Sequence, residues 1–213
     1  MATYILKSKN SDLPSMGLFG KELSADAETA GSITVSVPAS STYRGAGYTK
    51  PYKPNNADWE TGSITVEVKV TTANSNVNVS VQAHRLSGSG SLLESSSVPS
   101  SQSCGTTGVK TFTIASKDWA AGNCTDRIRI DYIFTNTATH GADQSVTIES
   151  NTTDCETVTS ITENAGTCRA TFVKNLRQYK PDHKTIIAEG GTTGGDGVSN
   201  NIYLDSLIAS RDR

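Results

Sequence analysis

The chain has 213 residues, which is enough for one large β-sandwich and its core. Nineteen basic and twenty-one acidic residues give a formal charge of -2, and no run of Lys or Arg exceeds two adjacent residues. This scattered charge argues against a nucleic-acid-binding surface. No apolar stretch approaches the roughly 18–20 residues that span a bilayer, and residues 1–10 lack the apolar core of a signal peptide, so we expect synthesis in the cytoplasm and no membrane contact.

The first thirty residues contain one short candidate strand, residues 3–6, whose residues 4–6 are apolar, followed by Pro14, Gly17 and Gly20. These residue types interrupt regular structure, so at most a short helical turn is expected, around residues 21–27. We therefore predict that residues 1–30 form an extended N-terminal arm and that residues 31–213 form one domain.

The clearest pattern after the arm is strict alternation of apolar and polar residues. Residues 63–71 place Ile64 and three valines on one face, and residues 77–83 repeat the pattern after a four-residue polar turn. Alternation with period two is typical of half-buried strands, and the short turn predicts an antiparallel hairpin.

The same alternation recurs to the end of the chain. The strongest case is residues 127–135, for which we expect Arg127, Arg129 and Asp131 on the solvent face. The further expected strands are 32–37, 110–114, 144–149, 157–161, 169–174, 184–188 and 201–208. Many short strands separated by Gly, Ser, Asn and Pro predict an all-β fold, an antiparallel two-sheet jelly-roll sandwich.

Three long segments between these strands are expected to be loops. Residues 40–58 contain Tyr43, Tyr48 and Tyr52, residues 87–103 are rich in Ser, and residues 189–201 are rich in Gly. Tyrosine is enriched at interfaces, so the first loop is a candidate interface lining. With Trp119, these tyrosines are also the candidate aromatics for stacking on a sugar; the alternative for the tryptophans is burial as hydrophobic anchors.

Four cysteines stand at the expected ends of strands: Cys104, Cys124, Cys155 and Cys168. No pair has zinc-ligand spacing, so we predict no metal site. Pairing of nearest neighbours would give disulfides Cys104–Cys124 and Cys155–Cys168, and the alternative is four free thiols. Disulfides would favour a protein that ends outside the cell.

Residue types that catalyse reactions are present without a catalytic pattern. His84 follows an expected strand and is interpreted as a surface or satisfied strand residue, while His140 and His183 lie in expected loops. No nucleophile elbow and no phosphate loop occurs. We therefore predict no catalytic residues, no cofactor and no enzyme activity.

The order and spacing of the expected strands resemble those of two groups of jelly-roll proteins. The segments that carry it are WETGSITVEV (59–68), residues 77–86, GVKTFTI (108–114), residues 127–135, QSVTI (144–148) and NIYLDSLI (201–208). Most of the chain from Gly31 onward is similar to the virion accessory proteins of tailed bacteriophages, which decorate capsids or form fibres, and to carbohydrate-binding modules.

The first resemblance implies a structural protein of the virus particle, a capsid decoration or head or tail accessory protein. Its expected partners are the major capsid protein, neighbouring accessory subunits and further copies of the chain, and its expected location is the extracellular virion. Residues 1–30 would then dock on the particle. The second resemblance implies, as the alternative, a glycan-binding protein that recognises a host-surface glycan.

Overall fold

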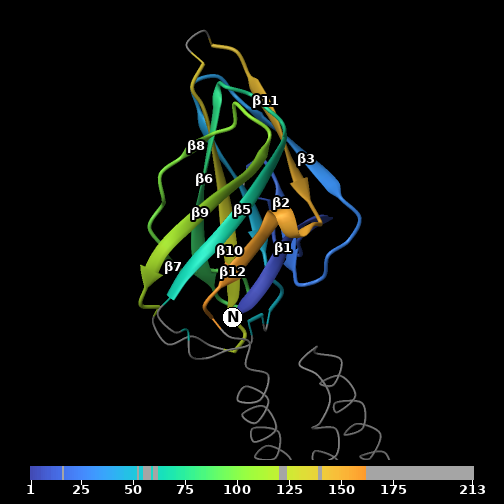
Figure 1. Ribbon diagram of the computed structural model, residues 1–213. Helices are drawn as coiled ribbons and strands as arrows, with labels where there is room; N and C mark the ends of the chain where they lie inside the picture. Colours follow the sequence, from blue (N-terminus) through green and yellow to red (C-terminus); the bar gives the residue numbers. More distant parts are fainter. Residues whose placement is uncertain are drawn as a thin grey trace, which may run out of the picture.

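The computed structural model describes residues 1–15, 17–51, 53–54, 59, 62–119, 124–138 and 141–161, which form strands and one short 3₁₀ helix (Figure 1). The elements are, in chain order, β1 (Ala2–Asn10), β2 (Gly20–Ser24), β3 (Gly31–Val37), β4 (Thr42–Tyr48), β5 (Gly62–Thr72), β6 (Val77–Leu86), β7 (Leu92–Ser95), β8 (Gln102–Ser103), β9 (Gly108–Lys117), β10 (Arg127–Asn136), β11 (Gln144–Ser150), η1 (Thr153–Cys155) and β12 (Glu156–Thr159).

Backbone pairing joins all these strands in the order β3-β11-β5-β12-β1-β2-β4-β10-β6-β7, with β9 paired to β5 and β8 paired to β6. Figure 1 shows β9, β5 and β12 in front of β10 and β6, so the continuous sheet folds over into two layers. The predicted all-β sandwich is confirmed. One pair, β2 with β4, is parallel, so the described sheet is mixed rather than wholly antiparallel.

The core lies between the two layers and is built by the alternation that the sequence displays. Val66 and Val68 of β5 point inward from the front, and Val79 and Val81 of β6 point inward from the back, all essentially inaccessible to solvent. Tyr132 of β10 packs in the same core. Because successive side chains of a strand point to opposite faces, each such strand contributes every second residue to this core.

The expected N-terminal arm is wrong, because β1 is an inner strand of the sheet. Ala2 pairs with Thr159 of β12 on one side, and Leu6 pairs with Leu23 of β2 on the other. Tyr4 and Leu6 are each 1% exposed. A boundary at residue 30 would therefore separate β1 and β2 from the strands they pair with.

The remaining strand predictions divide into confirmed and missed elements. Eight predicted strands have counterparts in β1, β3, β5, β6, β9, β10, β11 and β12. Strands β2 and β4 form where a helical turn and a loop were predicted, and β7 and β8 form within the predicted Ser-rich loop. The predicted strands 169–174, 184–188 and 201–208 and the Gly-rich loop 189–201 lie outside the described residues.

Strand β4 was missed because two glycines occupy its inward positions. A Cβ at Gly45 would lie 2.2 Å from the Phe19 ring, and one at Gly47 would lie 3.0 Å from Leu23. Phe19 and Leu23, at and just before strand β2, therefore fill the inward space beside β4. For this reason no apolar alternation appears in the sequence of β4 itself.

We predict that Leu6→Ala lowers the free energy of unfolding by about 2–5 kcal/mol, because it removes a buried side chain from the core. Thr3→Ala, an exposed position of the same strand, is the matched control and should change stability by no more than about 0.5 kcal/mol. Urea unfolding followed by circular dichroism measures both. Equal, small effects would mean that β1 is a dispensable arm.

Candidate functional site

A group of ionisable side chains lies on the outer face of strands β4, β10 and β6. The pairing register places Arg129 of β10 between Tyr48 and His84, and Asp131 between Ala46 and Gln82. The sequence predicted that this face of β10 meets solvent. Instead Arg129 and Asp131 are buried, so β10 is covered on both faces.

Asp131 is the centre of this group and is wholly buried. Its carboxylate lies 2.8 Å from Nε of Arg129, 2.9 Å from a terminal nitrogen of Arg44 and 3.1 Å from Nε2 of His84. Arg44 also donates to Oε1 of Gln82 at 3.0 Å. A buried carboxylate that lost these partners would cost several kcal/mol, so the cluster is strongly constrained.

The charge state of Asp131 depends on the opposing effects of its burial and of its charged and hydrogen-bonding partners. Burial alone would raise the pKa of the carboxyl group, but contacts with His84, Arg129 and Arg44 outweigh burial and hold the pKa below its ordinary value of 3.8. Asp131 is therefore a carboxylate at neutral pH, and its contacts are charge-assisted.

His84 connects this cluster to the edge strand β7. Its Nδ1 lies 2.8 Å from Oγ of Ser95, while its Nε2 faces Asp131. Ser, His and Asp are the residue types of a hydrolytic triad, in which the carboxylate stabilises the imidazolium that forms. Here Arg44 and Arg129 already neutralise that carboxylate, which weakens such stabilisation. We therefore interpret Ser95–His84–Asp131 as a structural tie across three strands.

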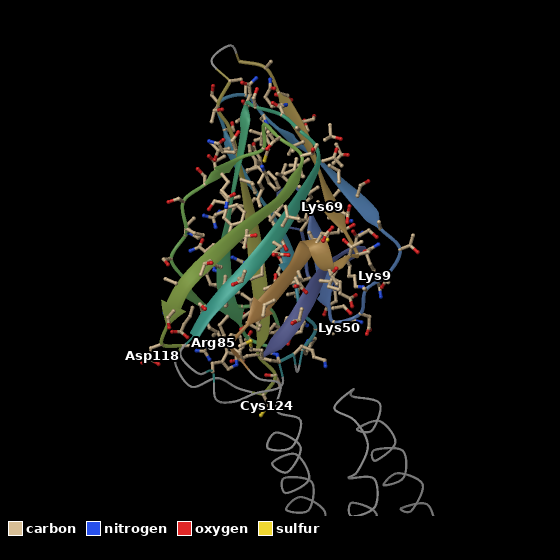
Figure 2. The ribbon with its side chains drawn as sticks, in the orientation of Figure 1. Lys9, Lys50, Lys69, Arg85, Asp118 and Cys124 are labelled. Atoms are coloured by element: carbon tan, nitrogen blue, oxygen red, sulfur yellow. The ribbon has the colours of Figure 1, made fainter. Side chains whose placement is uncertain are left out.

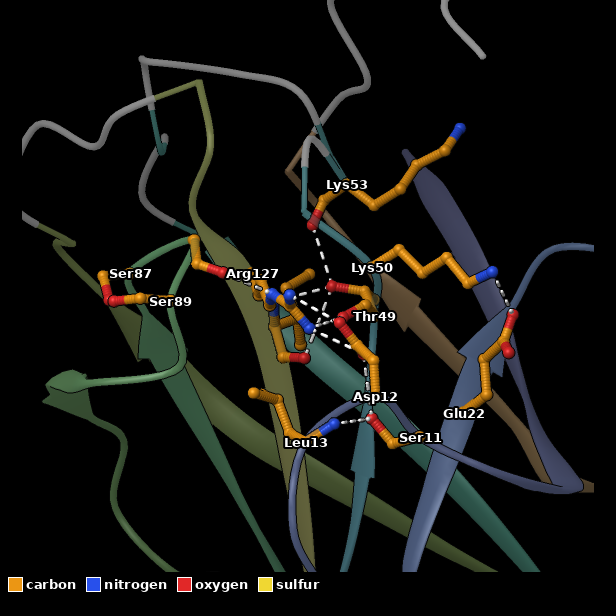
Figure 3. A network of polar contacts seen from close by, with 12 residues as sticks. Ser11, Asp12, Leu13, Glu22, Thr49, Lys50, Lys53, Ser87, Ser89 and Arg127 are labelled. Carbon is orange, nitrogen blue, oxygen red and sulfur yellow. Dashed lines mark hydrogen bonds and ion pairs between the residues drawn. The ribbon is translucent and has the colours of Figure 1, made fainter. Parts of the chain in front are cut away.

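A second polar cluster, drawn in Figure 3, is organised by the buried side chain of Arg127 at the start of β10. Its terminal nitrogens donate to both carboxylate oxygens of Asp12, at 2.8 and 2.7 Å, and its Nε donates to the carbonyl of Gly88 at 2.9 Å. Thr49, whose Oγ1 accepts from the amide of Ile128, lies beside it. Arg127 and the adjacent Ile128 thus fix loops from three distant parts of the chain to strand β10.

A third cluster surrounds the two tryptophans. Trp59 and Trp119 pack edge to face with ring centroids 5.8 Å apart, and both are 4% exposed. Arg85 lies over the Trp59 ring and pairs with Asp126 at 3.0 Å, and Lys117 lies over the Trp119 ring. These cation–π contacts occupy ring faces that a sugar would need.

The predicted ligand aromatics that the structure describes, Tyr43, Tyr48 and Trp119, are therefore not gathered into one site. Trp119 is buried, and Tyr48 is buried with its hydroxyl donating to the carbonyl of Pro14 at 3.1 Å. Tyr43 is 40% exposed on β4. Tyr52 lies outside the described residues, as do His140 and His183.

The predicted pairing of nearest-neighbour cysteines is wrong, because Cys104 and Cys155 are both free thiols in the core, whereas Cys124 is disulfide-bonded. Burial raises the pKa of Cys104 to about 11 and also raises the pKa of Cys155. Cys104 therefore serves as an apolar core group, while the thiol of Cys155 donates to the carbonyl of Thr152 at 3.1 Å. Cys168 lies outside the described residues.

The surface lysines form ordinary ion pairs on another side of the molecule. Figure 2 shows Lys9, Lys50 and Lys69 away from Arg85. Lys9 and Lys50 share Glu22, and Lys69 bridges Glu149 and Asp154, with nitrogen–oxygen distances of 2.7–3.8 Å. Pairs at such exposed positions contribute little to stability.

Within the part of the chain that the structure describes, no group of three or more His, Cys, Asp or Glu side chains is arranged to hold a metal ion. The same residues contain no helix long and apolar enough to cross a bilayer.

The sequence matches no protein-family model and no curated protein sequence. Among solved structures, it is similar to a carbohydrate-binding module of the β-sandwich superfamily, with 8% identity over 70% of this chain and 50% of that chain and a TM-score of 0.39. A subviral particle of infectious bursal disease virus VP2 gives 12% identity over 71% and 38%, with a TM-score of 0.34. An arabinose-bound α-L-arabinofuranosidase gives 12% identity over 74% and 26%, with a TM-score of 0.35. The chain matches no more than half of each of these three proteins, and likeness at this level assigns no function.

We predict that Asp131→Asn lowers the free energy of unfolding by about 3–5 kcal/mol, because it leaves the buried guanidinium group of Arg129 and the half-exposed one of Arg44 without their carboxylate. Asp26→Asn, at an exposed position, should change it by no more than about 0.5 kcal/mol. Chemical denaturation of both variants tests this. A small loss for Asp131→Asn would show that the cluster is not a structural tie.

Stability should also fall in acid. The hydrogen bonds from Arg127 lower the pKa of Asp12 below 3.8 in the folded state, as the partners of Asp131 do for its carboxyl group. A lowered folded pKa stabilises the protein above the unfolded pKa, and this contribution disappears as pH falls through the folded value. Denaturant titrations between about pH 6 and pH 2 should show this loss. Asp12→Asn should reduce the pH dependence, and Asp26→Asn should retain it.

Proposed function

We propose that this chain is a non-enzymatic structural protein of a virus particle, a capsid decoration or head or tail accessory subunit of a tailed phage. Its partners would be the major capsid protein or neighbouring accessory subunits, and its place would be the extracellular virion. The all-β sandwich is the architecture expected from the resemblance to such proteins.

The observation that carries a structural role is the use of the polar residues inside the fold. Asp131 of β10 contacts Arg129 of the same strand, Arg44 of β4 and His84 of β6. Arg127 holds Asp12 and the carbonyl of Gly88. Side chains of types that could bind a ligand or catalyse a reaction thus form contacts that join distant segments of the chain instead. Such ties suit a scaffold better than a reaction centre.

Glycan binding is the second candidate, and the exposure of Tyr43 is the observation that favours it. An exposed tyrosine ring can stack on the apolar face of a sugar. Trp119 and Tyr48 are poor reporters of such binding, because truncation of either would disturb the core.

The first test is peptide mass spectrometry of gradient-purified particles from the source culture, with copy number per particle. We expect a fixed stoichiometry of many copies, because a structural subunit repeats with the symmetry of the particle. Contaminating cytoplasmic proteins of similar abundance in the culture provide the control. Absence from particles that carry other virion proteins would overturn the viral proposal.

A glycan array with the purified protein tests the alternative. Saturable binding that is lost in Tyr43→Ala, while thermal unfolding shows a folded variant, would support it. Val109→Ala, at a similarly exposed apolar position of β9, is the control and should bind as the wild type does.

A further inference from the structure

The segment that leads from β1 into β2 lines a cavity of about 370 Å³. The apolar part of its wall consists of Leu13, Leu18 and Phe19, and the two leucines are partly exposed. Sites for small ligands in proteins have volumes of about 300–1,000 Å³ and combine apolar walls with a few placed polar groups. The cavity lies at the lower end of this range, so it suits a ligand of one or two rings.

The polar groups of the cavity are mainly hydrogen-bond donors. Asn10 and Ser15 are exposed lining residues, and neither the amide nitrogen of Asn10 nor the hydroxyl of Ser15 has a partner among the described residues. Lys21, a further lining residue, donates to the carbonyl of Ser8 at 2.7 Å and to Oδ1 of Asn10 at 2.9 Å. Because an ammonium group has three N–H donors, one donor of Lys21 is left for a ligand.

The positive charge of Lys21 is held in place without being neutralised. Both of its acceptors are uncharged, and no described carboxylate forms an ion pair with it. The acidic residues nearest to the cavity in sequence have other partners: Asp12 is turned toward Arg127 (Figure 3), and Glu22 pairs with two other lysines. An ammonium that is already ordered loses little freedom when it binds a ligand, so this position favours an anionic group.

We propose that this cavity binds an acidic sugar residue of a glycan. The sugar carboxylate would pair with Lys21, and the ring hydroxyls would accept hydrogen bonds from Asn10 and Ser15. One face of a sugar ring carries C–H groups, which would pack on Leu13 and Leu18 and remove apolar surface from water. A phosphate ion or a small free carboxylate lacks such a face, and a neutral sugar lacks the charge that complements Lys21.

The inference goes beyond the proposed role in a virus particle and does not depend on it. It concerns a site formed by one chain, so purified protein is sufficient to test it. It also differs from stacking on Tyr43, because that ring is not among the residues that line the cavity.

The test is a nuclear magnetic resonance titration of the full chain with D-glucuronate. We expect saturable shifts of the backbone amides of Leu13, Ser15 and Lys21, with millimolar affinity because few groups contact the ligand. D-glucose, which has the same ring without the charge, should bind at least about tenfold more weakly, since a site built around a charged group rejects an analogue that lacks it. Acetate, which has the carboxylate without the ring, should also bind at least about tenfold more weakly.

Two cavity variants and one matched control test the residues. Lys21→Met should weaken glucuronate binding at least about tenfold, because it removes the cation. Lys110→Met is the control: Lys110 is likewise held by an uncharged group, Oγ1 of Thr106 at 2.9 Å, but lies on β9 and does not line the cavity. This variant changes the net charge equally and should bind as the wild type does.

Ser15→Phe fills the cavity at an exposed position where the native side chain makes no tie, so it should abolish binding while thermal unfolding shows a folded protein. The inference is overturned if glucuronate does not saturate, if glucose or acetate binds equally well, or if Lys110→Met weakens binding as much as Lys21→Met. Binding that is lost in Tyr43→Ala but kept in both cavity variants would place the site at Tyr43 instead. None of these outcomes bears on the viral proposal, which is decided by the composition of particles.

Discussion

The neutralisation of one buried carboxylate, Asp131, is the interaction on which the back layer of the sandwich depends. Strand β10 contributes Ile130 and Tyr132 to the core on one face and the buried Asp131 to a polar layer on the other. A strand buried on both faces usually carries apolar residues throughout. Strand β10 departs from that rule because Arg44, Arg129 and His84 surround the carboxylate, each on one of the three strands involved.

The same strand gathers the loops that close one end of the sandwich. Arg127 holds the segment around Asp12 and the turn at Gly88, and Thr49 is bonded to the backbone of Ile128. Polar contacts of this kind favour one arrangement of neighbouring segments over others, because each donor has a defined partner. They give the molecule a fixed form, which is the property that a repeated building unit requires.

Alternation predicted the strands whose inward residues are apolar, because hydrophobic burial is encoded locally in β3, β5, β6 and β11. It failed at β4, where Phe19 and Leu23 fill the space beside Gly45 and Gly47, since that packing involves residues far away in the sequence. It also assigned Arg129 and Asp131 to solvent, because a polar residue in a strand is usually exposed. Their burial depends on partners from β4 and β6 that no local pattern reveals. Spacing between cysteines likewise could not show that Cys104 and Cys155 both face the core.

The position of β1 has a consequence for biosynthesis. Ala2 of β1 pairs with Thr159 of β12, so the neighbour of β1 on that side emerges from the ribosome only after the rest of the described fold. At about 5–20 residues per second, this leaves β1 waiting for roughly ten seconds or longer. Pairings between such distant residues also slow folding, because a long chain must close before they form. Until β12 is made, the apolar side chains of β1 are not fully buried. Production of this protein should therefore depend on chaperone capacity more than the size of the described fold suggests.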